Sequence, residues 1–171
     1  MKKTFKKLFA ALLAAALVLA MAVPAFAVTN TGTNGSITID NAVDGETYTI
    51  YRIFKLDSYN GDAYSYTVEP AWETFFSTGA GKDYITLDGQ GHPTWKAGVD
   101  STDDSDTVAA LAKAALTWAK VKGITGTAET ATGDTVTFFN LDLGYYLVDS
   151  SMGALCGLNT TTPNVTIKEK N

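Results

Sequence analysis

The sequence predicts a mainly β protein, a β-sandwich or barrel that carries two helical insertions. Short runs rich in β-branched and aromatic residues recur along the chain, and several alternate between apolar and polar side chains. Asp-Gly and Asn-Gly pairs, which are typical of hairpin turns, separate the first of these runs. Two other segments instead have apolar residues at helical spacing. No internal repeat is present, so a single folded domain is expected.

The first 27 residues are predicted to be a secretory signal peptide rather than part of the fold. Four lysines form a basic start, namely Lys2, Lys3, Lys6 and Lys7. An apolar run over residues 8–23 follows, and Ala25 and Ala27 form a small-residue cleavage site. The alternative is an uncleaved membrane anchor, but the apolar run is near the short end for a membrane span. The mature domain is therefore expected over residues 28–171, with no membrane contact after cleavage.

The charge of the mature chain excludes one class of partner. Loss of the four signal lysines changes the formal net charge from −5 to −9. Because phosphate contacts need a positive surface, this acidic balance argues against nucleic-acid binding.

The chain has a single cysteine, Cys156, so it has no intramolecular disulfide. Its neighbours are apolar or glycine, and no basic residue lies near it in sequence. We therefore expect a buried, unreactive thiol.

The first half of the chain predicts three strands, preceded by a polar lead over residues 28–35. Strands are expected over 36–40, 46–56 and 63–69, with turns at Asp44-Gly45 and Asn60-Gly61. Tight turns between successive strands favour an antiparallel meander of all three.

Two helices are predicted after these strands. A short helix begins at Pro70 and ends near Gly79, with Trp72, Phe75 and Phe76 on its apolar face. The clearest helix covers residues 105–122, where Ser105 or Asp106 can cap the start and Gly123 ends the run. Its apolar stripe contains Val108, Leu111, Ala112, Ala115, Trp118 and Ala119. The loop-rich region between the helices has two candidate short strands, 84–87 and 94–96.

Four further strands complete the prediction, over 127–130, 135–140, 145–150 and 165–169. Bulky residues occur on both sides of 145–150, so this strand should lie inside a sheet with both faces covered. In the last strand, alternation turns Val165 and Ile167 inward and Lys168 and Lys170 outward.

Residues suited to catalysis or metal binding are scarce. His92 is the only histidine and lies in a Gly/Pro loop, so a Ser-His-Asp triad or a histidine zinc site is not expected. A group of four aspartates, Asp100, Asp103, Asp104 and Asp106, suits helix capping better than calcium binding. Trp72 and Trp118 lie on apolar helix faces and are expected in the core, so only Trp95 among the tryptophans is free to be exposed. The sequence therefore predicts neither an enzyme nor a metal or cofactor site.

Several stretches of the sequence together carry a family resemblance. They are Gly35-Ser36-Ile37-Thr38-Ile39, residues 48–54, Asn140-Leu141-Asp142-Leu143-Gly144-Tyr145-Tyr146 and Gly153-Ala154-Leu155-Cys156. With the signal peptide, they resemble the N-terminal domain of a Gram-positive pilus backbone subunit, an isopeptide-forming-domain fimbrial protein of the major pilin type. The resemblance implies an immunoglobulin-like, Cna-B-like β-sandwich with helical insertions. It also implies a structural role in a cell-wall-attached pilus, with other pilin subunits and a sortase as partners.

The resemblance also implies a cross-linked lysine. In such subunits a sortase joins the next subunit to a lysine that often ends the first domain in a Tyr-Pro-Lys-Asn type motif. Lys170 and Asn171 match the last two positions of that motif, and the Tyr-Pro pair is absent. We therefore expect Lys170 to be the acceptor, with Lys168 as the second candidate. No Leu-Pro-x-Thr-Gly sorting signal follows in this sequence, and we expect the domain to be the first part of a longer subunit.

Domains of this family that form an internal isopeptide bond join a first-strand lysine to a last-strand asparagine beside an acid. Here Asn164 and Asp149 match the asparagine and the acid, but the first strand has no lysine. The nearest candidate, Lys55, lies on the second strand, so we expect no internal bond.

Two other functions remain open from the sequence. A secreted adhesin or carbohydrate-binding module would need an exposed aromatic patch near Trp95 and the 79–104 loop, and it would bind host surface ligands. An extracellular enzyme would need a pocket that gathers carboxylates with His92.

Secreted material is predicted to begin at Val28, because signal peptidase cuts after the small residue Ala27. N-terminal sequencing of protein from the culture medium checks this expectation. A product that keeps Met1 and partitions with membranes would contradict it.

Overall fold

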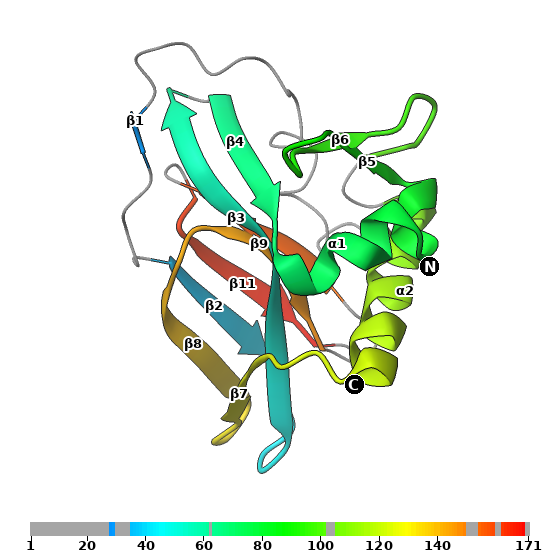
Figure 1. Ribbon diagram of the computed structural model, residues 1–171. Coiled ribbons are helices and arrows are strands. Elements are labelled where there is room, and N and C mark those ends of the chain that lie inside the picture. The colour runs from blue at the N-terminus through cyan, green and yellow to red at the C-terminus, as the bar shows by residue number, and fades with distance from the viewer. Residues whose placement is uncertain are drawn as a thin grey trace, which may run out of the picture.

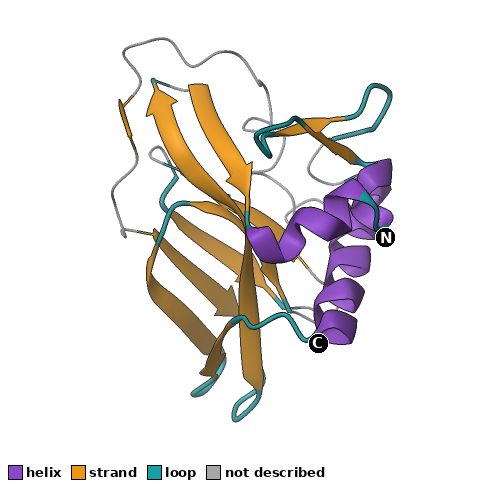
Figure 2. Cartoon of the chain, viewed as in Figure 1, coloured by secondary structure: helices purple, strands orange, loops and turns teal. Residues whose placement is uncertain are grey.

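A computed structural model of the chain describes residues 28–29, 35–61, 63–101, 105–149, 154–159 and 162–169. These residues form a mainly β protein with several sheets and two α-helices, as the sequence predicted (Figure 1 and Figure 2). Ala25, Ala27 and Lys170 lie outside the described residues. In the described part of the chain, no helix is long and apolar enough to span a membrane.

The larger sheet is built on one long strand, β3 (Thr47–Asn60). It pairs with four strands, namely β1 (Val28–Thr29), β4 (Ala63–Val68), β7 (Thr127–Thr130) and β9 (Gly144–Val148). A sixth strand, β10 (Ala154–Leu158), pairs with the other edge of β9. The first part of β3 pairs with β7 and the last part with β4, so β3 links the two ends of the sheet.

A second sheet of three strands has the order β11 (Asn164–Lys168), β2 (Gly35–Asp40) and β8 (Thr135–Leu141). The strands β2 and β11 run parallel, whereas β2 and β8 are antiparallel. Its inward residues include Ile37 and Ile39, which are fully buried. Figure 1 shows this sheet on one side of β3 and the helices on the other, an arrangement compatible with a β-sandwich.

The predicted meander of three strands is wrong at its first member. The strands β3 and β4 do form a hairpin, which turns at Gly61 with a φ of 59°. The turn at Gly45 also forms, with a φ of 81°, but β2 then pairs in the second sheet instead of beside β3. Turn residues specify that the chain reverses, and they do not specify whether the next strand pairs or crosses to another sheet.

The helices form near their predicted positions. They are α1 (Pro70–Ser77) and α2 (Asp106–Lys122), with the 3₁₀ turn η1 (Ala80–Asp83) and the short strands β5 (Ile85–Leu87) and β6 (Pro93–Trp95) between them. The Ser105 side chain caps α2 by accepting from the backbone N–H of Val108 at 3.1 Å. Gly123 ends the helix in a left-handed conformation.

Aromatic side chains join the helices to the sheet. Trp72 meets Tyr51 of β3 edge to face, with ring centroids 6.2 Å apart. The ring of Phe75 packs against the ring of Trp118 on α2, with centroids 5.6 Å apart, so the two helices also contact each other. Trp118 is only half-buried, and the Nζ atom of Lys122 lies over its ring, 4.9 Å from the ring centroid. The α2 stripe therefore ends at the protein surface.

Two strands were not predicted. The strand β10 has the sequence Ala-Leu-Cys-Gly-Leu, in which no apolar–polar alternation occurs. The strand β1 has only two residues and lies in the segment expected to be a polar lead. Both are short strands that depend on the strand they pair with.

The strand β9 is confirmed as a covered central strand, since all five of its residues are buried. It lies so close to β3 that a Cβ atom at Gly144 would fall well inside contact distance of the Phe54 carbonyl oxygen. A backbone atom cannot move aside cheaply, so only glycine fits at this position.

Replacing Gly144 by alanine is predicted to lower the free energy of unfolding by about 2–3 kcal/mol, because the added methyl group forces β9 away from β3. Urea unfolding followed by circular dichroism measures the change. Gly89→Ala is the matched control, since a Cβ atom there meets nothing within 4 Å. Equal stability of the two variants would contradict the proposed contact.

Candidate functional site

Among the described residues, a cleft of about 590 Å³ that is open to solvent lies next to Arg52. Four parts of the chain form its walls: the middle of β3, the junction of β4 and α1, the connection from α2 to β7, and the turn from β8 to β9. The lining residues are Tyr51, Arg52, Glu69, Ala71, Trp72, Ile124, Thr125, Gly126, Thr127, Asn140, Leu141, Asp142 and Tyr146. The cleft thus combines polar side chains with three aromatic ones.

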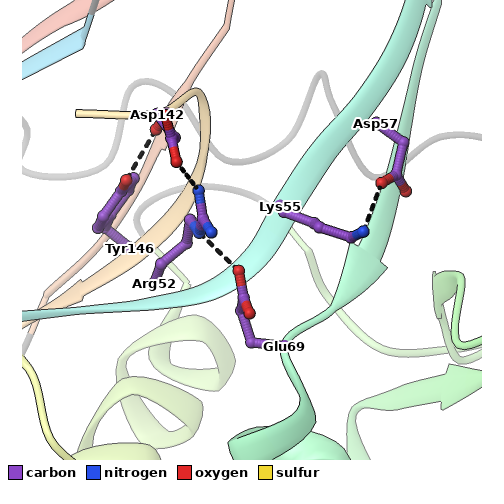
Figure 3. Close-up of polar contacts among 6 residues, drawn as sticks. All are labelled: Arg52, Lys55, Asp57, Glu69, Asp142 and Tyr146. Atoms are coloured by element: carbon purple, nitrogen blue, oxygen red, sulfur yellow. Dashed lines mark hydrogen bonds and ion pairs between the residues drawn. The ribbon is translucent and has the colours of Figure 1, made fainter. Parts of the chain in front are cut away.

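Arg52 connects two walls of the cleft. Its Nε atom donates to Glu69 Oε1 at 2.6 Å, and its Nη1 atom donates to Asp142 Oδ2 at 2.7 Å. Figure 3 shows the guanidinium between the two carboxylates, with Glu69 on one side and Asp142 on the other. A planar guanidinium can hold two carboxylates at once in fixed directions, which an ammonium group cannot do.

Arg52, Glu69 and Asp142 form a cluster of one positive and two negative side chains. Burial lowers the pKa of Arg52, but Glu69 and Asp142 outweigh burial, and the net effect raises the pKa above its ordinary value. One guanidinium faces two carboxylates, so the cluster carries one excess negative charge.

Tyr146 fixes the turn that carries Asp142. It lies opposite Arg52 in the β3–β9 register, and its hydroxyl donates to the backbone oxygen of Asp142 at 2.7 Å. Burial raises the pKa of Tyr146, so the hydroxyl remains a donor at neutral pH. The Asp142 residue is therefore held both at its backbone and at its side chain.

Asn140 stands at the same turn in an unusual backbone conformation. Its φ is 55°, in the left-handed region that asparagine tolerates better than most residues. Its neighbour Phe139 is 70% exposed, whereas Phe138 is 1% exposed. The two phenylalanines point to opposite faces of β8, and Phe139 lies on the solvent side.

The residues considered for an internal isopeptide bond have separate partners. Lys55 is exposed and forms an ion pair with Asp57 at 3.1 Å. Asn164 is exposed and accepts from the Ser36 hydroxyl at 2.7 Å. Asp149 pairs with Lys120 at 3.1 Å. The structure does not bring Lys55, Asn164 and Asp149 together as one buried group.

The last strand places its residues as alternation predicted. Val165 and Ile167 are buried, and Lys168 is exposed opposite Asp40 in the parallel register with β2. Glu169 is buried, and its backbone N–H donates to the Asp40 carbonyl at 2.8 Å. Lys168 is thus the candidate acceptor that the structure describes.

The other sequence candidates lie apart from the cleft. Trp95, the one tryptophan that the sequence left free to be exposed, is half-buried against the core, and its Nε1 atom is fully buried. The reason is pairing of β6 with β5, which holds Trp95 beside Ile85. The Nδ1 atom of His92 lies 2.8 Å from Oδ2 of Asp88. The backbone N–H groups of Gln90 and His92 donate to the other carboxylate oxygen of Asp88, and together these contacts close the loop.

Of the remaining candidates, the described aspartates lie at the start of α2 and the cysteine lies in the core. Asp106 begins α2, Asp100 accepts from the Ser105 hydroxyl through its backbone oxygen, and Asp103 and Asp104 lie outside the described residues. No group of three metal-ligating side chains occurs in the parts of the chain that the structure describes. Cys156 is buried as predicted, and burial raises the pKa of its thiol to about 12.

Sequence reasoning missed the cleft. The available signal was Arg52 itself, a charged residue inside the apolar segment 48–54. Such a charge needs a partner when it is partly buried. Its partners are 17 and 90 residues away, so local spacing does not identify them.

Comparison with known proteins adds no identification. No protein-family model matches the chain, and no curated protein matches it.

Replacing Arg52 by methionine is predicted to lower the free energy of unfolding by about 1–2 kcal/mol, because two partly buried carboxylates lose their shared donor. Arg52→Lys should recover less than half of this loss, since one ammonium group cannot span both carboxylates. Chemical unfolding of each variant provides the measurement.

Lys55→Met is the matched control, because it breaks an exposed ion pair with Asp57 and should cost less than about 0.5 kcal/mol. An Arg52→Met variant as stable as this control would show that the cluster does not support the fold.

Proposed function

We propose that the chain is a structural, non-enzymatic subunit of a sortase-assembled pilus on a Gram-positive cell surface. It is exported, folds as an immunoglobulin-like, Cna-B-like domain, and is cross-linked to neighbouring subunits through a lysine at the end of the domain. Lys170 is the first candidate and Lys168 the second. The partners in this proposal are other pilin subunits and the sortase.

The observation that carries the proposal is the way β11 presents its lysine. Val165 and Ile167 anchor the strand in the core, while Lys168 between the flanking buried residues points to solvent. The hydrogen bond from Glu169 N–H to the Asp40 carbonyl extends this order past Lys168. An amine on an ordered strand loses little conformational freedom when it enters an enzyme cleft.

The two ends of the described domain also suit a fibre. The strand β1 pairs with Ser58 and Tyr59 at the far end of β3. The strand β11 ends beside Asp40, from which a short turn leads to Thr47 at the near end of β3. Between Thr47 and Ser58 a strand rises about 36 Å at about 3.3 Å per residue. The lysine at the β11 end is therefore separated from the β1 end by about the length of β3, so a subunit attached there adds to the length of a fibre.

The pairing of β2 with β11 supports the fold assignment. The internal bond of the family joins the first strand to the last, which requires them to be neighbours, and here β2 and β11 pair directly. Ser36 stands opposite Asn164, and the two side chains meet on the outer face of the sheet. Amide formation requires a buried amine opposite the asparagine, and this domain has the partly exposed Ser36 at that position. We therefore propose that the domain has no internal bond.

Polymerisation tests the proposal in the host cell. The subunit at its natural length is expressed with its sortase, and high-molecular-weight ladders are compared for Lys170→Ala, Lys168→Ala and the unmodified protein. We expect Lys170→Ala to abolish the ladder, because the sortase acyl-enzyme then has no amine to attack it.

Lys113→Ala is the matched control, since Lys113 is an exposed lysine on α2. Loss of the ladder only in Lys168→Ala would move the assignment to that residue. A ladder that survives both substitutions would refute the cross-link at this end of the domain.

A further inference from the structure

The cleft beside Arg52 has features that a pilus subunit does not need. It is large enough for a small molecule, it has polar side chains on several sides, and an exposed phenylalanine lies next to one of its lining residues. We propose that this cleft binds a neutral saccharide, with Asn140 and Asp142 hydrogen-bonding to its hydroxyl groups and Phe139 packing against its ring. This inference is independent of the proposed pilus function.

The lining of the cleft mixes hydrogen-bond donors with hydrogen-bond acceptors. Arg52 and the amide of Asn140 supply N–H donors, and Glu69 and Asp142 supply carboxylate acceptors. The hydroxyl of Thr125 at the wall can do either. Sugar hydroxyl groups both donate and accept, so they can satisfy such a lining without any change of protonation.

The charge around the cleft favours a neutral ligand. The Arg52 cluster has one excess negative charge, and the chain without residues 1–27 has a formal net charge of −9. These charges disfavour an anionic ligand. A cationic ligand would have to compete with the guanidinium that already holds Glu69 and Asp142. A neutral ligand meets neither obstacle.

The size and the rigidity of the cleft also suit a saccharide. A volume of about 590 Å³ lies within the range of small-molecule clefts and is enough for one or two sugar rings. Arg52 holds the Asp142 side chain and Tyr146 holds its backbone, so the acceptor is already oriented before a ligand arrives. Preorganised polar groups cost less free energy to engage.

Phe139 is an exposed aromatic residue next in sequence to the cleft lining. Its side chain is 70% exposed on a strand whose preceding residue is buried, so core packing does not account for it. It directly precedes Asn140, which lines the cleft. Phe139 is therefore an exposed aromatic ring one residue before the cleft lining, and such a ring offers the apolar surface that the C–H face of a sugar ring covers.

The experiment uses the secreted chain and a panel of named probes. Lactose, maltose, cellobiose and N,N′-diacetylchitobiose represent neutral saccharides, sialic acid represents an anionic one, and lysine methyl ester represents a free ammonium compound. Saturation-transfer NMR detects binding at millimolar concentration, and titration gives the dissociation constants. We expect at least one neutral disaccharide to bind and neither charged probe to do so.

Two variants locate the binding. Asn140→Gly removes the amide and keeps the left-handed backbone, which glycine adopts readily, and Phe139→Ala removes an exposed ring. Each should weaken the bound disaccharide about tenfold, as expected for the loss of one good contact. Val121→Ala is the matched control, because Val121 is 75% exposed on α2 and does not line the cleft.

Three results would overturn the inference. The first is that no neutral disaccharide of the panel binds. The second is binding that is undiminished in both Asn140→Gly and Phe139→Ala while circular dichroism shows them folded. The third is binding of lysine methyl ester or sialic acid alone, which would indicate a charged ligand instead.

Discussion

The structure depends on the close approach of β9 to β3. The carbonyl oxygen of Phe54 occupies the space that a Cβ atom at position 144 would need, so glycine permits the pairing of the two central strands. On the same strand β9, Leu147 and Val148 are fully buried although they point to opposite faces. One face lies toward the helices and the other toward the three-stranded sheet (Figure 1). Both outer layers are therefore positioned by the same short strand.

Arg52 adds a polar constraint to this apolar centre. It brings together Glu69, which is 17 residues away, and Asp142, which is 90 residues away. The paired carboxylates offset the cost of removing the guanidinium from water, and their directional hydrogen bonds fix the turn after β8 relative to the start of α1. The same contacts that stabilise the domain also orient the polar wall of the cleft.

Local patterns predicted most elements but not their long-range pairing. Alternation located β2, β4 and β11, and Ser105 and Gly123 marked the two ends of α2, because these signals depend on a few neighbouring residues. The sheet to which β2 belongs, the strand β10 and the cleft depend on partners far along the chain. Trp95 illustrates the same limit, since pairing of β5 and β6 half-buries a side chain that the sequence left exposed.

The parallel pairing of β2 and β11 has a mechanical consequence. The chain arrives at Gly35, the start of β2, and departs after Lys168, the end of β11, and these positions lie at opposite ends of the five paired residues. Tension on the chain therefore pulls the two strands past each other along their length. In this shear geometry, all the hydrogen bonds between them carry load together, whereas bonds loaded at one end of a ladder would break one at a time. A domain arranged in this way resists stretching by virtue of its topology, without any covalent bond across the sheet.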